Sequence, residues 1–183
     1  MSIKIGFTGF NCSGKDTAAD ILVEIGFKHF SLSDIIRDEI KELGLEENRE
    51  TLIYVGNDLR KNLGNNILAK RTNEKIKDLD KAVISSIRNE FEVEELRKNK
   101  DFILVSIEAS IELRFKRAMD RKRIENIKTL DDFKKIDEKE SSDDPGKQQL
   151  HKIKEMADYN IPNNGSLDEL REKILNLIKK LSE

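Results

Sequence analysis

The 183-residue sequence contains one cysteine, two prolines and no tryptophan, and aromatic residues make up only 5% of it. A single cysteine excludes an internal disulfide, and scarce aromatic side chains leave few surfaces on which nucleic-acid bases could stack. The 34 basic and 36 acidic residues give a net charge of −2, which provides no general attraction to nucleic acid or to a membrane. No apolar run approaches the length of a membrane-spanning helix, and the first residues lack the apolar core of a signal peptide. We therefore expect a cytoplasmic protein without a nucleic-acid or membrane partner.

What the chain does contain is a glycine-rich loop with the spacing Gly-x4-Gly-Lys at residues 9–15, after an apolar stretch at residues 3–8. Successive backbone N–H groups of such a loop form a nest for an anion, and its glycines permit close approach of the ligand. Lys15 adds a mobile positive charge that reaches terminal phosphates. The pattern predicts a bound nucleoside triphosphate, taken as ATP. The residues expected to contact it are Gly9, Asn11, Cys12, Ser13, Gly14, Lys15, Asp16 and Thr17.

The residue after Lys15 departs from the usual form of this motif. A serine or threonine hydroxyl normally follows the lysine and binds Mg²⁺, whereas here Asp16 follows it and Thr17 comes next. Either Thr17 supplies the hydroxyl, or Asp16 holds the metal ion through water. Both are therefore candidate Mg²⁺ ligands.

Apolar runs alternate with helical patterns along the chain, which favours a parallel sheet with crossover helices. The predicted strands cover residues 3–8, 28–31, 81–85, 102–107 and 159–161. The predicted helices cover 14–26, 35–44 with Ser33 and Asp34 as its cap, 48–62, 65–77, 91–99, 110–122 and 166–181. Residues 125–150 form a polar segment without a predicted element. The sequence thus predicts one α/β domain over residues 1–183, a three-layer sandwich with a central parallel sheet.

Six cations lie within ten positions, opposed only by Asp120: Arg114, Lys116, Arg117, Arg121, Lys122 and Arg123. Arg114, Arg117 and Arg121 are spaced i, i+3, i+7 and share one helix face. One interpretation is a basic lid over residues 114–150, in which Arg117 and Arg121 act catalytically by neutralising charge in a phosphoryl-transfer transition state. The alternative is a solvated helix face paired with the acids at 125–140.

Charged residues also follow the second and third predicted strands. In open α/β sheets, ligands bind outside the carboxyl ends of the strands. Asp34, Arg37 and Arg88 are therefore expected to face a small-molecule phosphate acceptor, with Arg37 and Arg88 clamping its phosphate. The alternative is that Asp34 caps a helix and Arg37 lies on the surface.

Several segments together resemble P-loop kinases of the nucleoside monophosphate kinase superfamily. These segments are residues 14–20, 30–37, 83–88, 142–148 and 157–165, and they are similar to phage-type deoxynucleotide kinases and to dephospho-CoA kinase-like proteins. The resemblance covers nearly the whole chain. It implies an acceptor-binding helical insert at about 34–78 and a short lid. It also implies roles for Lys15 at the triphosphate, Thr17 at Mg²⁺, Asp34 and Arg37 at the acceptor, Arg88 at its phosphate, and Arg117 and Arg121 in the lid. Residues Asn160 to Asn163 are expected to touch the adenine through backbone groups.

The chain departs from these kinases just after the third strand, where they usually carry an acidic residue. Here the position holds Ser85 and Ser86, so Asp34 or Asp16 would have to supply the charge. The leading hypothesis is an ATP-dependent kinase that phosphorylates a nucleoside or deoxynucleoside monophosphate. A second is phosphorylation of a hydroxyl, as in dephospho-CoA kinase, with Asp34 as the general base. A third is a nucleotide-binding switch without turnover. The acceptor, the choice of ATP or GTP, and the oligomeric state stay open.

Overall fold

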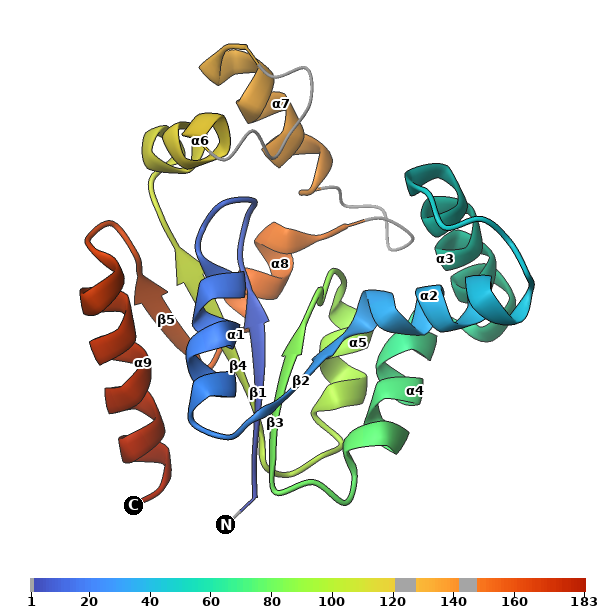
Figure 1. Cartoon of the computed structure of the whole chain (residues 1–183), viewed down its shortest axis with the longest axis horizontal. Helices are drawn as coiled ribbons and strands as arrows, with labels where there is room; N and C mark the ends of the chain where they lie inside the picture. The colour runs from blue at the N-terminus through green and yellow to red at the C-terminus, as the bar shows by residue number, and fades with distance from the viewer. Residues whose placement is uncertain (1, 121–127, 142–147) are drawn as a thin grey trace.

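The computed structural model describes residues 2–120, 128–141 and 148–183. Its centre is a parallel sheet with the strand order β2-β3-β1-β4-β5. The strands are β1 (Ile3–Thr8), β2 (Lys28–Ser31), β3 (Lys81–Ser85), β4 (Phe102–Glu108) and β5 (Tyr159–Pro162). The predicted α/β class and parallel sheet are therefore confirmed (Figure 1).

Helices cover both faces of this sheet (Figure 1). They are α1 (Lys15–Glu24), α2 (Leu32–Glu42), α3 (Arg49–Leu63), α4 (Ile67–Ile76), α5 (Glu90–Leu96), α6 (Ile111–Asp120), α7 (Leu130–Lys139), α8 (Leu150–Glu155) and α9 (Leu167–Leu181). Among the described residues, no helix is long and apolar enough to cross a membrane.

Alternating side chains of the strands build two separate cores. Ile84 and Leu104 pack against α4, α5 and α8, whereas Val83 and Val105 pack against α1 and α9 on the opposite face. Because the central strands β1, β3 and β4 are buried on both faces, most of their residues are apolar, which is why the sequence pattern predicts them well. The result is the three layers expected for this fold.

Helices α2, α3 and α4 follow one another between β2 and β3 and form the helical region predicted at 34–78. Its first helix begins earlier than predicted, at Leu32, and the expected cap is wrong. The Ser31 hydroxyl accepts the N–H of Ser33, and the Asp34 carboxylate accepts the N–H of Ser31 at 3.1 Å. Ser31 is therefore the cap, and Asp34 completes a capping box.

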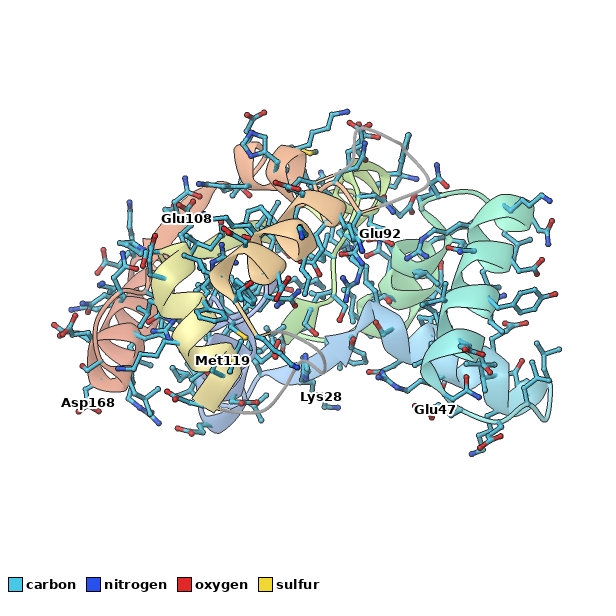
Figure 2. The ribbon with its side chains drawn as sticks, turned by 90° about the horizontal axis from the view of Figure 1, so that it is seen from above. Lys28, Glu47, Glu92, Glu108, Met119 and Asp168 are labelled. Atoms are coloured by element: carbon cyan, nitrogen blue, oxygen red, sulfur yellow. The ribbon has the colours of Figure 1, made fainter. Side chains whose placement is uncertain are left out.

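The segment 125–150 is not simply polar, because it contains α7 and the first residue of α8. Thr129 caps α7, with Asp132 closing the capping box, and Phe133 in its middle is fully buried. Seven of the ten residues of this helix are charged, so the segment looks polar in the sequence. Figure 1 shows α6 and α7 above the loop end of β1, and Figure 2 labels Met119 of α6 in a view from above. The segment predicted as a lid thus contains α7 and part of α6.

Candidate functional site

The glycine-rich loop joins β1 to α1 in a backbone conformation that side chains rarely adopt. Gly9, Cys12 and Gly14 have φ angles of 141°, 60° and 103°. A Cβ at Gly14 would lie 2.2 Å from the Asn163 amide nitrogen, and one at Gly9 would lie 2.4 Å from the Ile107 carbonyl oxygen. Glycine is therefore required at both positions, by conformation and by space.

Two side chains hold the loop from outside through its carbonyl oxygens. The Asn163 amide donates to the Ser13 carbonyl at 2.7 Å, and Asn163 is buried. Arg117 of α6 donates to the Asn163 carbonyl at 3.0 Å and lies 3.4 Å from the carbonyls of Cys12 and Ser13. The structure thus places Arg117 beside the loop. There its guanidinium contacts the carbonyl oxygens of Cys12 and Ser13.

The segment expected near the adenine contacts the glycine-rich loop through its last residue, Asn163. Asn160 is exposed in β5, where it pairs with Ser106 of β4. Asn163, three residues later, makes the contact with the loop. Its only sign in the sequence is its place after a strand, since the contact spans 150 positions.

Arg114, the first arginine of the basic cluster, is committed to an ion pair. It is 5% exposed, and its guanidinium donates to both carboxylate oxygens of Asp137 on α7, one of them at 2.9 Å. The guanidinium also lies over the rings of Phe10 and Phe133, at 5.1 and 5.5 Å. The interpretation that pairs the basic cluster with the acids at 125–140 is therefore confirmed for Arg114. The Arg114–Asp137 pair joins α6 to α7. Arg121 lies outside the described residues.

Cys12 connects the loop to the same two helices. Its side chain is buried and packs with Ala118 of α6 and Phe133 of α7. The glycine-rich loop, α6 and α7 thus share one small apolar cluster.

A cavity of about 20 Å³ lies between the loop and the end of β3. Lys15 lines it from the loop side, and Arg88 lines it from the strand side. Glu140, just after α7, lines it as well, and its carboxylate accepts the side-chain amide of Asn11 at 2.7 Å. Nothing in the sequence marks Glu140, which is one acid among many in a polar segment. Two cations and one carboxylate therefore line the same small cavity beside the glycine-rich loop.

The pKa of the Glu140 carboxyl is shifted by its surroundings. Burial raises the pKa of the Glu140 carboxyl above its ordinary value. Arg88, the hydrogen bond from Asn11 and Lys15 oppose this shift, while the neighbouring Asp137 adds to it. Such a perturbed carboxyl in a cavity is a typical mark of a functional group.

Arg88 is held in place by a buried carboxylate. Its backbone N–H donates to Glu92 at 2.7 Å, and the other oxygen of Glu92 pairs with Arg60 of α3 at 3.3 Å. Burial raises the pKa of the Glu92 carboxyl, and Arg60 acts against that rise. The Arg88 guanidinium donates to Gln148 at 2.7 Å. Arg88 therefore occupies the predicted position at the strand end, tied to the helical region.

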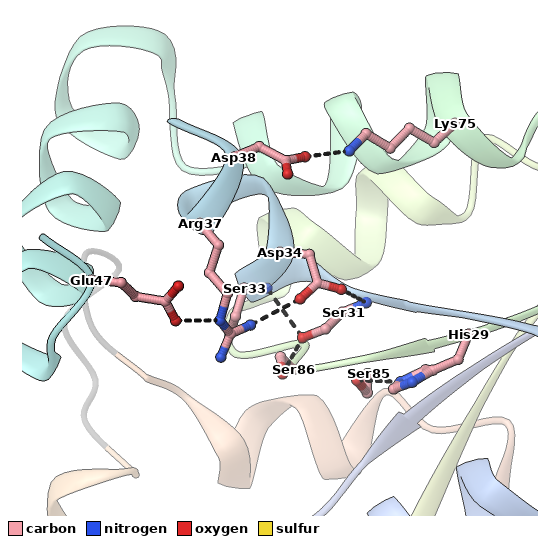
Figure 3. A network of polar contacts seen from close by, with 10 residues as sticks. All are labelled: His29, Ser31, Ser33, Asp34, Arg37, Asp38, Glu47, Lys75, Ser85 and Ser86. Carbon is pink, nitrogen blue, oxygen red and sulfur yellow. Dashed lines mark hydrogen bonds and ion pairs between the residues drawn. The ribbon is translucent and has the colours of Figure 1, made fainter. Parts of the chain in front are cut away.

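Asp34 and Arg37 are not among the described residues that line this cavity. Figure 3 shows them paired with each other, with Arg37 also paired to Glu47. Arg37 pairs with Asp34 at 2.8 Å and with Glu47 at 3.0 Å, and all three side chains are 43–54% exposed. Asp34 is also occupied by the capping box of α2. The arrangement matches the alternative interpretation, a helix cap beside a surface arginine.

The end of β3 carries hydroxyls at the position where the sequence resemblance led us to expect an acid. The His29 imidazole shares a hydrogen bond with Ser85 at 2.8 Å, and Ser31 shares one with Ser86 at 2.9 Å (Figure 3). Ser86 has a φ of 63°, a strained value for a serine. Asp34 does not replace the missing acid in the cavity, whereas Glu140 places a carboxylate there.

A family model described as an AAA domain matches residues 8–134. A UPF0200 protein of Methanosarcina mazei is 32% identical, and the alignment covers 98% of this chain and 95% of the relative. The chain is a member of the AAA-domain and UPF0200 families. A UPF0200/UPF0201 protein of Archaeoglobus fulgidus is 36% identical over 98% of this chain, which spans 56% of that relative.

Solved structures similar to this UPF0200 chain include kinases. A shikimate kinase from Acinetobacter baumannii has a TM-score of 0.56 at 19% identity, covering 98% of this chain and 94% of its own. A gluconokinase from Sinorhizobium meliloti has a TM-score of 0.56 at 13% identity, covering 98% and 93%. These likenesses show a P-loop kinase-like fold.

The donors near the loop suit Mg²⁺ carried by a triphosphate. Asp16 and Thr17 lie in the first turn of α1, beside Lys15. Within residues 2–120, 128–141 and 148–183, no three His, Cys, Asp or Glu side chains form a metal cluster. Mg²⁺ keeps several waters and is usually held by substrate phosphates with one or two protein oxygens. This UPF0200 chain therefore offers a donor set that fits a nucleotide-borne Mg²⁺ through Thr17 or Asp16.

Proposed function

We propose that this chain is an ATP- and Mg²⁺-dependent kinase that phosphorylates a small anionic acceptor. The observation that carries the proposal is that Lys15 of the glycine-rich loop and Arg88, just after β3, line one cavity. Phosphoryl transfer needs little covalent chemistry from the protein. It needs two reactants held in line and cations that neutralise the developing charge.

On the donor side, the glycine-rich loop would bind the triphosphate and Lys15 its terminal phosphates. Mg²⁺, held by Thr17 or Asp16, would neutralise charge on the phosphate oxygens. Arg117 and Asn163 keep the loop in shape by binding its carbonyls. The proposed roles of Arg121 at the phosphates and of Asn160 near the adenine rest on the sequence resemblance.

On the acceptor side, a nucleoside or deoxynucleoside monophosphate is the first candidate. Arg88, fixed by Glu92, would hold its phosphate. Arg37 would have to leave Asp34 and Glu47 to assist. A second candidate is a hydroxyl acceptor on a molecule that carries its own anionic group. The Glu140 carboxylate in the cavity favours this candidate, since transfer to a hydroxyl needs a general base.

The test is ADP release from Mg-ATP against a panel of ribo- and deoxyribonucleoside monophosphates, dephospho-CoA, shikimate and gluconate. We expect selective turnover of one acceptor, reduced by at least about 100-fold in Lys15→Ala because a transition-state cation is lost. ATP binding without transfer to any acceptor would instead support a nucleotide-binding switch. Failure to bind ATP would contradict the whole proposal.

A further inference from the structure

Glu140 is held in a defined position at the junction of two helices. Its N–H donates to the Ile136 carbonyl at 3.0 Å, closing α7. Its carbonyl accepts the N–H of Leu150, the first residue of α8, at 2.9 Å. The Arg114–Asp137 pair fastens the same helix one turn earlier. The backbone therefore delivers this carboxylate to the cavity in a fixed orientation.

The two oxygens of the carboxylate differ in their surroundings. Oε1 accepts the Asn11 amide at 2.7 Å. Oε2 is buried, and within the described residues it has no hydrogen-bond partner. A buried charged oxygen without a donor is costly. It is therefore available to a proton or a hydroxyl group brought by a ligand.

The other acids considered for this site are placed elsewhere. Asp34 is exposed and occupied by the capping box and Arg37. Ser85 and Ser86 stand where an acid is usual. Among the described residues that line the cavity, Glu140 is the one carboxylate, and Lys15 and Arg88 flank it.

We propose that Glu140 is the general base of the transfer and that the acceptor atom is a hydroxyl oxygen. The acceptor oxygen forms a bond to the γ-phosphorus as the bond from that phosphorus to the bridging oxygen breaks. The electron pair of the broken bond leaves with ADP, and the hydroxyl proton passes to Oε2 of Glu140. This inference rests on the proposed kinase function and specifies its acceptor.

Charge and protonation both support a hydroxyl acceptor. A third anion between two phosphates would oppose their approach, whereas an alcohol gains a base from it. Burial and Asp137 raise the pKa of the Glu140 carboxyl, while Arg88, Asn11 and Lys15 lower it, with a net rise above the ordinary 4.5. The base form is lost as the pH falls through this raised value. Turnover should therefore decline on the acid side.

The test compares wild type with Glu140→Gln and with Glu138→Gln, an exposed carboxylate two residues earlier. Turnover is measured with the alcohols shikimate, gluconate, dephospho-CoA and nucleosides, and as slow Mg-ATP hydrolysis with water as the acceptor. Binding is measured with a fluorescent ADP analogue. We expect Glu140→Gln to lower turnover by about 100-fold or more, to keep ADP affinity, and to lose the acid limb of the pH profile. Glu138→Gln should match wild type.

Three results would overturn the assignment while leaving the kinase function intact. One is unchanged turnover in Glu140→Gln. Another is tighter ADP binding with faster turnover, because the carboxylate would then only compete with phosphate. The third is transfer by wild type to monophosphates and to no alcohol or water. Wild type that binds no ATP would remove the proposed function itself, together with this role for Glu140.

Discussion

Two arginine–aspartate pairs near the site consist of the same residue types but differ in how deeply the structure buries them. Arg114 and Asp137 join α6 to α7, with side chains 6% and 15% exposed. Arg37 and Asp34 lie within α2, with side chains 43% and 54% exposed. Both arginines come from segments that the sequence assigns to ligand binding. Surroundings, rather than residue type, separate a structural pair from a surface pair.

Burial determines how much each pair contributes to the stability of the fold. Removing one partner of a buried pair leaves an uncompensated charge, whereas an exposed pair is screened by water and salt. Arg114 also contacts the phosphate loop, at the Phe10 ring and at the Asn11 carbonyl. Arg37 also pairs with Glu47, in the segment between α2 and α3. We therefore expect mutations on the two sides to differ severalfold in their effects.

The largest effect is expected from Asp137→Asn, which leaves Arg114 buried without its counter-charge. The expected loss of stability is about 3–5 kcal/mol. Urea unfolding, with hydrogen exchange of the α7 amides, would measure it. Asp131→Asn is the matched control, since the Asp131 side chain is 81% exposed on the same helix. A loss below about 1 kcal/mol, as for an exposed pair, would show that the two pairs are equivalent.

An intermediate effect is expected from Asn163→Ala on the same side. It removes the 2.7 Å donor to the Ser13 carbonyl and leaves that oxygen only the 3.4 Å contact with Arg117, at a cost of about 1–2 kcal/mol. Because the loop loses its fixed shape, ADP binding should weaken by about tenfold, measured by calorimetry. Asn160→Ala, exposed in β5, should bind ADP normally, because the adenine contact proposed for Asn160 uses its backbone groups. Equal weakening in both variants would show that the bond from Asn163 to the loop does not set ADP affinity.

The smallest effect is expected from Arg37→Ala. Its exposed pairs should contribute less than about 1 kcal/mol, and the difference should shrink at high salt. Lys75→Ala, which removes the exposed Lys75–Asp38 pair beside it, is the control for unfolding by urea (Figure 3). A rise in the acceptor KM in Arg37→Ala alone, with stability unchanged, would show that Arg37 leaves Asp34 to bind the acceptor.

The parts of the fold that were predicted correctly have local signals. The central strands β1, β3 and β4 are mainly apolar because both of their faces are buried, and the phosphate loop is encoded within seven residues. Helix α7 was missed because only a few apolar side chains, led by Phe133, anchor it in a polar segment. The cap of α2 was misplaced because the serines at 31 and 33 are equally plausible caps in the sequence.

The residues of the candidate site also divide into those with a local signal in the sequence and those without one. Lys15 was predicted from the glycine-rich motif, and Arg88 from its place after the third strand, a rule that the parallel sheet enforces. Glu140 was not predicted, and the bond from Asn163 to the loop was not foreseen, because their contacts with Asn11 and Ser13 span 129 and 150 positions. No spacing rule links residues so far apart.

The sequence by itself determined the parallel sheet and the glycine-rich loop that receives a phosphate, since both depend on neighbouring residues and backbone geometry. Only the tertiary structure decided which charges meet at that loop. It buried Arg114 against Asp137, left Arg37 on the surface and carried Glu140 from the end of α7 to a cavity between Lys15 and Arg88. The physical reason is that the energy of a charge depends on its burial and on its partners, and packing sets both.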